Sequence, residues 1–452
     1  MAGETLLLVG NGGREGAIAE AIADSAFPPD VLYYTGANVG IDGLADRRMQ
    51  VMQVDCDIKN VQGIVDAAKS IPSDPQKLTV VVGPEAPLVA GAADRLRGEG
   101  IHVFGPSAEA AKLEGSKIFA TKFMRENRIA HPGTMILESR AEAEKYLLTA
   151  DPESIVLKAD GLAGGKGVVL PKTREEMMKV AQDMLSGEAF DGAGKAGILV
   201  QERLTGPEVS VFVVADGRGG YSIIPYFAQD HKRLEEGDKG PNTGGMGAYS
   251  PLPDGYLTEK QLAGIEDIVQ KTIEGMEKRG TPYQGTLYLG LMMAEQRAGA
   301  PVVIEYNCRF GDPEAQVVLP LMTRNGLDVY DMFYSTARGE APAMRPARHL
   351  GGSALTVTLA AAGYPGKPAT GAVIHGLDHT YPNTQIYHGG TKRINEQTII
   401  TNGGRVLYVT GMGRDVDEAA AAAYAAIGGP DGIYFEGMQV RDDIGHRIRK
   451  HS

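Results

Sequence analysis

Short apolar runs and glycine-rich turns alternate through the first hundred residues. The apolar run 5–9 leads into glycines at positions 10, 12 and 13, and a helical spacing of apolar residues begins at Ala17. This order predicts a strand, a glycine turn and a helix. Further strands are predicted over 31–34 and 78–82, the second ending in a Gly-Pro-Glu-Ala-Pro turn. We therefore expect an open parallel sheet whose carboxyl-terminal loops hold a ligand.

A second region begins near residue 116. Ser116 is a good helix N-cap, and the aromatic pair Phe119 and Phe123 has helical spacing before the helix ends near Asn127. Strand-like residues 155–159 and 168–170 then flank the glycine-rich loop 161–167. We expect this segment to form a mobile hairpin, followed by a hinge at residues 192–195.

The rest of the chain predicts a second α/β segment and then a β-rich one. Strands are expected over 198–200 and 209–214, and apolar residues between 262 and 276 have helical spacing. From about residue 336 short strands alternate with turns, followed by one alanine-rich helix that Asp415 caps. A chain of 452 residues exceeds what one core usually supports. The sequence thus predicts an α/β, or multidomain α+β, protein with four units: 1–115, 116–195, 196–335 and 336–452.

Composition narrows the class of protein. Hydrophobic residues make up 43% of the chain, enough for several cores, and the net charge of −12 argues against a broad surface for nucleic acid or anionic membranes. The first residues lack a basic leader and no apolar run reaches membrane-spanning length, so we expect a cytoplasmic protein. Cys56 and Cys308 stand far apart, so neither a disulfide nor a zinc site is expected.

The most informative stretch joins clustered charge to a flexible backbone. The run Asp230-His231-Lys232-Arg233 is followed by Asn242-Thr243-Gly244-Gly245-Met246-Gly247. Glycines let backbone N–H groups approach a ligand closely, and the cationic side chains suit phosphate or carboxylate. Because the chain is acidic overall, the predicted ligand is a small anion bound in a local pocket.

Two glycine clusters resemble nucleotide-binding motifs without matching them. In the first, Glu15 stands where the third glycine of a dinucleotide fingerprint belongs, so a phosphate or substrate loop is the better interpretation. In the second, Gly167 follows Lys166 where a P-loop requires Ser or Thr. That segment is either a loop that folds over phosphates, with Lys158 and Lys166 as point charges, or a plain flexible hairpin.

Oxygen ligands for a metal ion are predicted near residue 305. Glu305 and Asn307 are two apart on a predicted strand, so both side chains point to one face. Mg²⁺ prefers one or two protein oxygens together with phosphate and water. A solvated strand face is the alternative, but the adjoining Arg309 and Asp312 add charge beside a turn and favour the site.

Taken together, these segments resemble the ATP-grasp superfamily and, within it, the family of phosphoribosylamine–glycine ligases, or glycinamide ribonucleotide synthetases. The resemblance covers essentially the whole chain, so it implies an ATP-grasp fold with an N-terminal substrate domain, a mobile lid subdomain, a catalytic subdomain and a C-terminal β-rich domain. The motifs that carry it are Gly12-Gly13-Arg14-Glu15, 82–88, 113–117, 158–167, 230–233, 241–251, 305–314 and 441–445.

The resemblance also implies an ATP site. Lys117 and Lys158 would bind phosphates, the segment 201–204 would hold adenine, and Glu305 and Asn307 would carry Mg²⁺, with Mn²⁺ as a possible substitute. The residues expected to contact ATP are Lys117, Lys158, Gly164, Gly165, Lys166, Gly167, Glu202, Leu204 and Glu208.

The family's reaction would be ATP-dependent ligation of glycine to 5-phosphoribosylamine through a glycyl phosphate, giving glycinamide ribonucleotide, ADP and phosphate in purine biosynthesis. We expect Arg309, Lys232 and Asp230 to act in catalysis. The expected substrate contacts are Gly12, Gly13, Arg14, Glu85, His231, Asn242, Thr243, Gly244, Gly245, Met246 and Asp312. A monomer or weak homodimer is expected, with a possible transient contact to the enzyme that makes phosphoribosylamine.

Three positions depart from the family's pattern. Gly16 stands where histidine is usual, Gly164 replaces an alanine in the lid, and Gln201 and Arg203 depart from the common Glu-Glu-Phe linker. Two other interpretations stay open: an ATP-grasp ligase for another carboxylate or bicarbonate, and a nucleotide-binding sensor without turnover. The segment 230–251 argues against the first, and the complete set of lysine, arginine and metal-ligand residues argues against the second.

Overall fold

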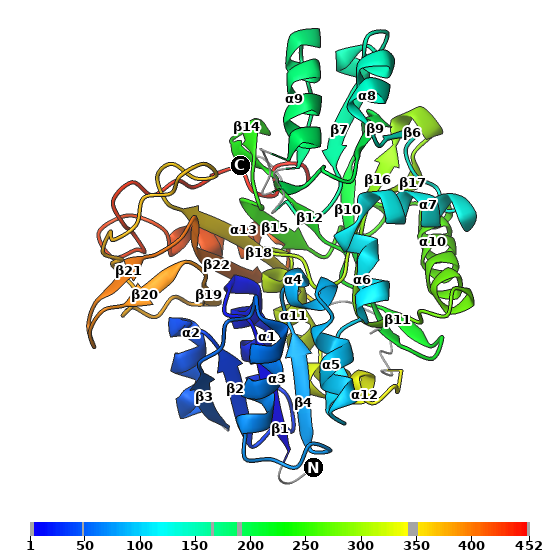
Figure 1. Ribbon diagram of the computed structural model, residues 1–452. Helices are drawn as coiled ribbons and strands as arrows, with labels where there is room; N and C mark the ends of the chain where they lie inside the picture. Colours follow the sequence, from blue (N-terminus) through cyan, green and yellow to red (C-terminus); the bar gives the residue numbers. More distant parts are fainter. Residues whose placement is uncertain (1–3, 48, 164–166, 188–191, 342–350, 450–452) are drawn as a thin grey trace.

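The computed structural model describes residues 4–47, 49–163, 167–187, 192–341 and 351–449. Within these residues the strands form four sheets of four or five strands and two hairpin sheets of two strands. The predicted α/β class is confirmed. In Figure 1 the first sheet lies at the bottom, the C-terminal sheet at the left and the strands next to α8 and α9 at the top.

The N-terminal unit is an open parallel sheet in the order β3-β2-β1-β4-β5. The central strand β1 is fully buried, which its unbroken apolar sequence explains. Strand β3 was not predicted, because it lies at an edge and its side chains are largely exposed. The strands are β1 (Thr5–Val9), β2 (Val31–Thr35), β3 (Gln50–Val54), β4 (Leu78–Val82) and β5 (His102–Phe104). The helices are α1 (Gly13–Ala23), α2 (Val39–Asp42), α3 (Val61–Ser70), α4 (Glu85–Val89), α5 (Ala92–Gly98) and α6 (Ala108–Gly115).

The next unit is an antiparallel sheet in the order β6-β9-β7-β8 with a core of its own. Ser116 caps α7 as predicted, since its hydroxyl accepts from Phe119 N. The predicted hairpin is confirmed by the pairing of β7 with β8. Its elements are α7 (Lys117–Glu126), β6 (Thr134–Leu137), α8 (Arg140–Leu147), β7 (Ile155–Ala159), β8 (Val168–Val169), α9 (Arg174–Ser186) and β9 (Ile198–Glu202).

The third sheet, in the order β11-β10-β16-β17, packs against the first. One apolar core joins residues of β1, β4 and α6 to residues of β10 and β16. Helix α10 presents a buried stripe that includes Ile265, Val269 and Ile273, while Leu262, which shares the spacing, is 40% exposed. The elements are β10 (Glu208–Asp216), β11 (Tyr221–Ile223), α10 (Glu259–Lys278), β16 (Gln284–Ala294), β17 (Ala300–Asn307), α11 (Ala315–Arg324) and α12 (Val329–Ala337).

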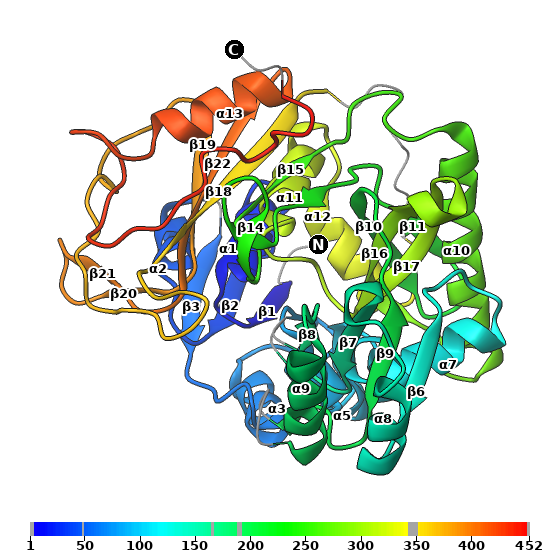
Figure 2. The same cartoon turned by 90° about the horizontal axis from the view of Figure 1, so that it is seen from above.

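The fourth sheet draws strands from two distant parts of the chain, in the order β12-β15-β18-β22-β19. Strands β12 and β15 precede α10, yet β15 pairs with β18. Asp415 caps α13, as predicted. Figure 2 shows α11 between this sheet and the strands β10 and β16. The elements are β12 (Gln229–Asp230), β13 (Arg233–Glu235), β14 (Lys239–Asn242), β15 (Gly247–Ser250), β18 (Ser353–Ala360), β19 (Thr384–His388), β20 (Thr391–Arg393), β21 (Ile399–Thr401), β22 (Arg405–Gly413) and α13 (Val416–Ala425).

Candidate active site

Lys232 lies between the carboxylates of Glu208 and Glu305. The family resemblance implied that Glu208 contacts ATP and that Glu305 binds the metal. Its Nζ is 2.9 Å from Glu208 Oε2 and 3.3 Å from Glu305 Oε1. Glu208 begins β10, Glu305 lies in β17, and Lys232 follows β12, so two different sheets build this cluster. The three side chains are 34–41% exposed, which leaves them accessible to a ligand. The Lys232 ammonium, helped by Lys158, lowers the pKa of Glu305 to about 2, although partial burial of the carboxylate acts in the opposite direction.

Two further lysines, Lys158 and Lys117, lie near the Glu305 carboxylate. Lys158 in β7 donates from Nζ to Ile304 O at 3.0 Å, and Lys117 at the start of α7 donates to Gly161 O at 3.1 Å. Burial lowers the pKa of Lys158 to about 8, and the charges of Lys117 and Lys232 act in the same direction, although Glu305 opposes them. Three lysines from three parts of the chain therefore gather around Glu305, a density of positive charge that suits phosphate oxygens.

Glu305 and Asn307 fit a divalent cation. They share one face of β17. The surrounding hydrogen-bond acceptors assign the side-chain nitrogen of Asn307 to the position from which it donates to Glu114 Oε1 at 2.9 Å and to Tyr306 O at 3.2 Å. Its Oδ1 is then left as a possible ligand beside the ionised Glu305. No group of three or more His, Cys, Asp or Glu side chains able to hold a metal occurs among the residues that the structure describes. The two oxygens that Glu305 and Asn307 offer are hard ligands of the kind that a divalent cation takes when phosphate and water complete its shell.

Arg309 is held by two carboxylates from the N-terminal unit. Its Nε is 3.2 Å from Glu85 Oε2, and its Nη2 is 2.9 Å from Glu114 Oε1. Burial alone would raise the pKa of Glu85, but Arg309 and Arg14 lower it to about 2. These contacts fix the Arg309 guanidinium two residues beyond the end of β17, next to the candidate metal ligand Asn307.

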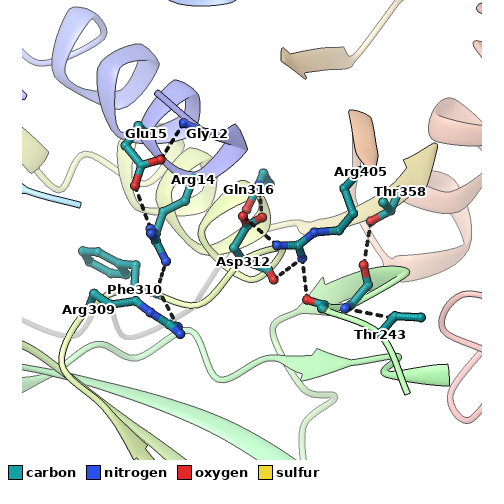
Figure 3. A network of polar contacts seen from close by, with 12 residues as sticks. Gly12, Arg14, Glu15, Thr243, Arg309, Phe310, Asp312, Gln316, Thr358 and Arg405 are labelled. Carbon is teal, nitrogen blue, oxygen red and sulfur yellow. Dashed lines mark hydrogen bonds and ion pairs between the residues drawn. The ribbon is translucent and has the colours of Figure 1, made fainter. Parts of the chain in front are cut away.

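The glycine turn before α1 joins the same network (Figure 3). Glu15 accepts from Gly12 N at 2.7 Å and pairs with Arg14 Nε at 2.9 Å. Arg14 also donates from Nη1 to Phe310 O at 3.2 Å. Gly13 packs so closely on Tyr408 that an added Cβ would lie 2.0 Å from the ring. The turn is thereby tied both to the chain that follows β17 and to the C-terminal sheet.

Arg405 connects the loop 242–247 to Asp312 (Figure 3). Its Nη2 is 3.0 Å from Asp312 Oδ2, and its Nη1 donates to Asp312 O at 2.6 Å and to Gly244 O. Within the loop, Thr243 Oγ1 accepts from Gly245 N at 3.0 Å. Asn242 ends the hairpin strand β14 just before them. The predicted substrate residues of this loop are thus brought together with Asp312.

The neighbours Asp230, His231 and Met246 lie deeper. Burial, together with the nearby Glu314 carboxylate, raises the pKa of Asp230 well above its ordinary value. His231 is fully buried, accepts from Gly445 N through Nε2 at 3.1 Å, and burial lowers its pKa to about 3. Met246 is also fully buried and donates from its backbone N to His231 O. Any effect of His231 or Met246 on a substrate therefore passes through residues around them.

The predicted adenine segment, 201–204, begins within the last two residues of β9 and continues beyond the strand. Glu202 Oε2 accepts from Gly133 N at 3.0 Å and pairs with Arg297 at 2.9 Å, while Leu204 is buried. Gly167 precedes β8 and accepts through its carbonyl from Ala159 N at 2.9 Å. Gly164, Gly165 and Lys166 lie outside the described residues.

Two residues at the centre of these contacts were not predicted. Glu114 lies within a motif that carried the family resemblance, and its charge among the buried residues Ala111 and Leu113 was a usable signal. Arg405 gave no such signal, because its partner Asp312 is 93 residues away.

Comparison with known proteins agrees with this geometry. Three family models match, described as the N domain, the ATP-grasp (A) domain and the C domain of phosphoribosylglycinamide synthetase, over residues 4–114, 115–315 and 354–447. The human trifunctional purine biosynthetic protein adenosine-3 is 39% identical over 98% of this chain, which spans 42% of that protein's length. The phosphoribosylamine–glycine ligase of Escherichia coli K12 is also 39% identical, over 98% of each chain.

Solved structures show the same relationship. A phosphoribosylamine–glycine ligase from Thermotoga maritima superposes with a TM-score of 0.79 at 32% identity, covering 97% of this chain and 100% of that one. Biotin carboxylase from Campylobacter jejuni reaches a TM-score of 0.70 at 16% identity over 97% and 93% of the two chains, a likeness of fold alone. The chain therefore belongs to the phosphoribosylglycinamide synthetase family of ATP-grasp carbon–nitrogen ligases.

Proposed function

We propose that this protein ligates glycine to 5-phosphoribosylamine with ATP, giving glycinamide ribonucleotide, ADP and phosphate as a step of purine biosynthesis. The single observation that carries the proposal is the gathering of Lys117, Lys158 and Lys232 around Glu305, with Asn307 on the same strand face. This arrangement provides both the positive charge and the oxygen ligands that phosphoryl transfer requires. Full-length similarity to phosphoribosylamine–glycine ligases supports the choice of substrates.

ATP would bind with its phosphates on the lysine cluster. Lys117 and Lys158 would contact phosphate oxygens, the segment around Glu202 and Leu204 would hold adenine, and Glu208 would accept from the ribose. Residues 116–195 would act as a lid over the phosphates. Glu305 and Asn307 would hold Mg²⁺, or Mn²⁺ in its place, which neutralises phosphate charge when bound.

The chemistry would take place in two steps. A glycine carboxylate oxygen attacks the γ-phosphorus, the bond to the ADP oxygen breaks, and glycyl phosphate forms. The amine of phosphoribosylamine then attacks the glycyl carbonyl carbon, the bond to the phosphate oxygen breaks, and the amine loses a proton. The positive charges of Lys232 and Arg309 would stabilise the transferring phosphoryl group. Asp230 would take up the amine proton, because a raised carboxyl pKa makes it a stronger base.

Both substrates would bind between the glycine turn that precedes α1 and the loop 242–247. Gly12, Gly13, Arg14 and Glu85 lie on one side, and the loop 242–246 with Asp312 lies on the other, joined through the Arg309 and Arg405 networks. Glycine and phosphoribosylamine both carry charged groups that these residues complement. We expect no nucleic-acid or membrane ligand and a cytoplasmic enzyme that is a monomer or weak dimer. Among the described residues no helix is long and apolar enough to cross a membrane.

An assay of ADP release tests the proposal. Mg²⁺-ATP is supplied with glycine and freshly made phosphoribosylamine, singly and together, and the products are identified by mass spectrometry. Release that requires both substrates, with glycinamide ribonucleotide formed, is the expected result. Glycine labelled with ¹⁸O in its carboxylate should transfer one labelled oxygen to phosphate if glycyl phosphate forms. ATP turnover with bicarbonate or another carboxylate in place of glycine, or ATP binding without turnover, would contradict the proposal.

A further inference from the structure

One buried carboxylate, Glu114, contacts three consecutive residues at the end of β17. It lies at the end of α6 and is 8% exposed. Its Oε2 accepts from Cys308 N at 2.7 Å, while its Oε1 accepts from Arg309 Nη2 at 2.9 Å and from the Asn307 amide nitrogen at 2.9 Å. Glu114 therefore binds a candidate metal ligand, the backbone beside it and a candidate catalytic arginine at the same time.

The two oxygens of Glu114 have different partners. The bond from Cys308 N anchors the carboxylate to the backbone that follows β17, so the position of Oε1 is set by the fold. Oε1 can only accept hydrogen bonds while the carboxylate is ionised. Asn307 must then turn its nitrogen toward Glu114 and to Tyr306 O, which points its Oδ1 away from them. The amide oxygen is the atom of Asn307 that a hard cation binds.

Glu114 is itself held firmly. Its neighbours Ala111 and Leu113 are buried in the core that the first and third sheets share. A Cβ on the next residue, Gly115, would lie 3.0 Å from the Val89 side chain, so α6 packs tightly against α4. Glu114 therefore gives Asn307 and Arg309 a fixed reference in the N-terminal unit.

We propose that Glu114 is a positioning residue that orients the Asn307 amide for a divalent cation and holds Arg309 beside the transferring phosphate. The proposal rests on the proposed ATP-dependent reaction and names a residue that acts through the others without touching substrate. Removing a partner that orients a metal ligand typically weakens metal affinity by about 10- to 100-fold.

Glu85 offers a matched control. It is also a carboxylate bound to Arg309, at 3.2 Å, but within the part of the chain that the structure describes it makes no hydrogen bond to Asn307 or Cys308. Glu85→Gln removes one negative partner of Arg309, as Glu114→Gln does, and leaves the Asn307 amide with its acceptor. Metal affinity separates the two variants if Glu114 acts through Asn307.

The experiment measures Mn²⁺ binding to the enzyme–ADP complex by the electron paramagnetic resonance signal of free Mn²⁺. ADP binding in EDTA is measured in parallel, to show that the nucleotide site is intact. We expect Glu114→Gln to raise the Kd for Mn²⁺ by about 10-fold or more with ADP affinity unchanged in EDTA. Glu85→Gln should stay within about twofold of the unaltered protein, since it leaves the metal ligands oriented.

A double variant tests the route of the effect. In an Asn307→Ala background Glu114→Gln should cause no further loss of Mn²⁺ affinity, because the ligand that Glu114 orients is gone. Glu114→Asp keeps the negative charge but shortens the side chain by one methylene, so it should also weaken Mn²⁺ binding. This variant tests the proposal if Glu114→Gln does not fold. Unchanged Mn²⁺ affinity in the single variants, or an equal loss in the Asn307→Ala background, would overturn the proposal. If the ligase assay fails but Mn²⁺ binding changes as expected, the proposed substrates are wrong and the role of Glu114 in orienting Asn307 is still supported.

Discussion

Gly13 and Gly16 lie one turn apart in α1, yet only one of them has room for a methyl group. A Cβ on Gly13 would lie 2.0 Å and 2.6 Å from Tyr408 ring carbons and 2.9 Å from Gln316 Nε2. A Cβ on Gly16 would meet its nearest neighbours, among them Asn38 and the His388 carbonyl, at 3.9 Å. Alanine at these two positions therefore tests the packing between the N-terminal turn and the C-terminal sheet.

The expected effects have opposite signs. Alanine is favoured over glycine by about 1 kcal/mol in a helix interior, so Gly16→Ala should stabilise the protein by about 0.5–1 kcal/mol near the helix start. Gly13→Ala gains the same amount but overpacks the site, which costs about 1–3 kcal/mol. The upper end applies because Tyr408 is 2% exposed and Arg405 lies 5.6 Å over its ring, so the ring has little room to move. We expect Gly13→Ala to lower the free energy of unfolding by about 2 kcal/mol, about 3 kcal/mol below Gly16→Ala.

Guanidinium titration followed by circular dichroism measures both variants under the same conditions. Replacing Tyr408 with leucine in the Gly13→Ala background should recover part of the loss, since the ring that the methyl group meets is gone. Equal free energies of unfolding for the two alanine variants would refute the close contact of Gly13 with Tyr408. So would a loss in Gly13→Ala that Tyr408→Leu leaves unchanged.

The remaining predictions concern three charged residues. The pKa of Lys158 is about 8, so the KM for ATP should rise as pH rises through 8 and the lysine loses its proton, whereas Lys158→Arg should give a flat profile. The lowered pKa also means that Lys158 disfavours the folded state below about pH 8, where the lysine is charged in both the folded and the unfolded chain. This destabilisation should fade as pH rises from about 8 to the ordinary pKa of 10.5. Urea titrations at stepped pH measure it. Arg441 is fully buried and binds Asp443 with both Nε at 2.7 Å and Nη2 at 2.8 Å, so Arg441→Met should cost about 3–5 kcal/mol of stability by denaturant titration. Arg309→Lys keeps the charge but cannot bind both Glu85 and Glu114 in the same geometry, and its kcat should fall about 100-fold in steady-state assays.

Local signals in the sequence predicted much of the fold. The apolar run of β1 before its glycine turn, the N-caps at Ser116 and Asp415, and the same-face spacing of Glu305 and Asn307 all depend on residues a few positions apart. Such patterns act through backbone geometry, which is the same in any protein. They were sufficient to predict an α/β protein whose first sheet is parallel and whose second sheet contains the hairpin of β7 and β8.

The contacts between units could not be predicted in this way. Strand β15 pairs with β18 more than a hundred residues later, and Arg405 binds Asp312 across 93 positions. No local pattern records such a pairing, because it depends on how separate sheets pack. His231 illustrates the consequence: its charge cluster predicted a local pocket in which the His231 side chain meets a small anion, yet its ring is buried and accepts from Gly445 N.

The ion pairs of Lys232 with Glu208 and Glu305 would have to separate for ATP to bind. Lys232 is shared by Glu208 and Glu305, and all three side chains are about one-third exposed or more. An ion pair with that much exposure contributes about 0–1 kcal/mol, so separating it costs little. Under the proposed function, Glu305 would then bind the metal, Glu208 the ribose and Lys232 a phosphate oxygen, and each group would exchange one charged or polar partner for another. Because each of the three charged groups keeps a charged or hydrogen-bonding partner before and after the exchange, the site avoids the several kcal/mol that a buried ion without a partner would cost, and little of the ATP binding energy is needed to separate the ion pairs.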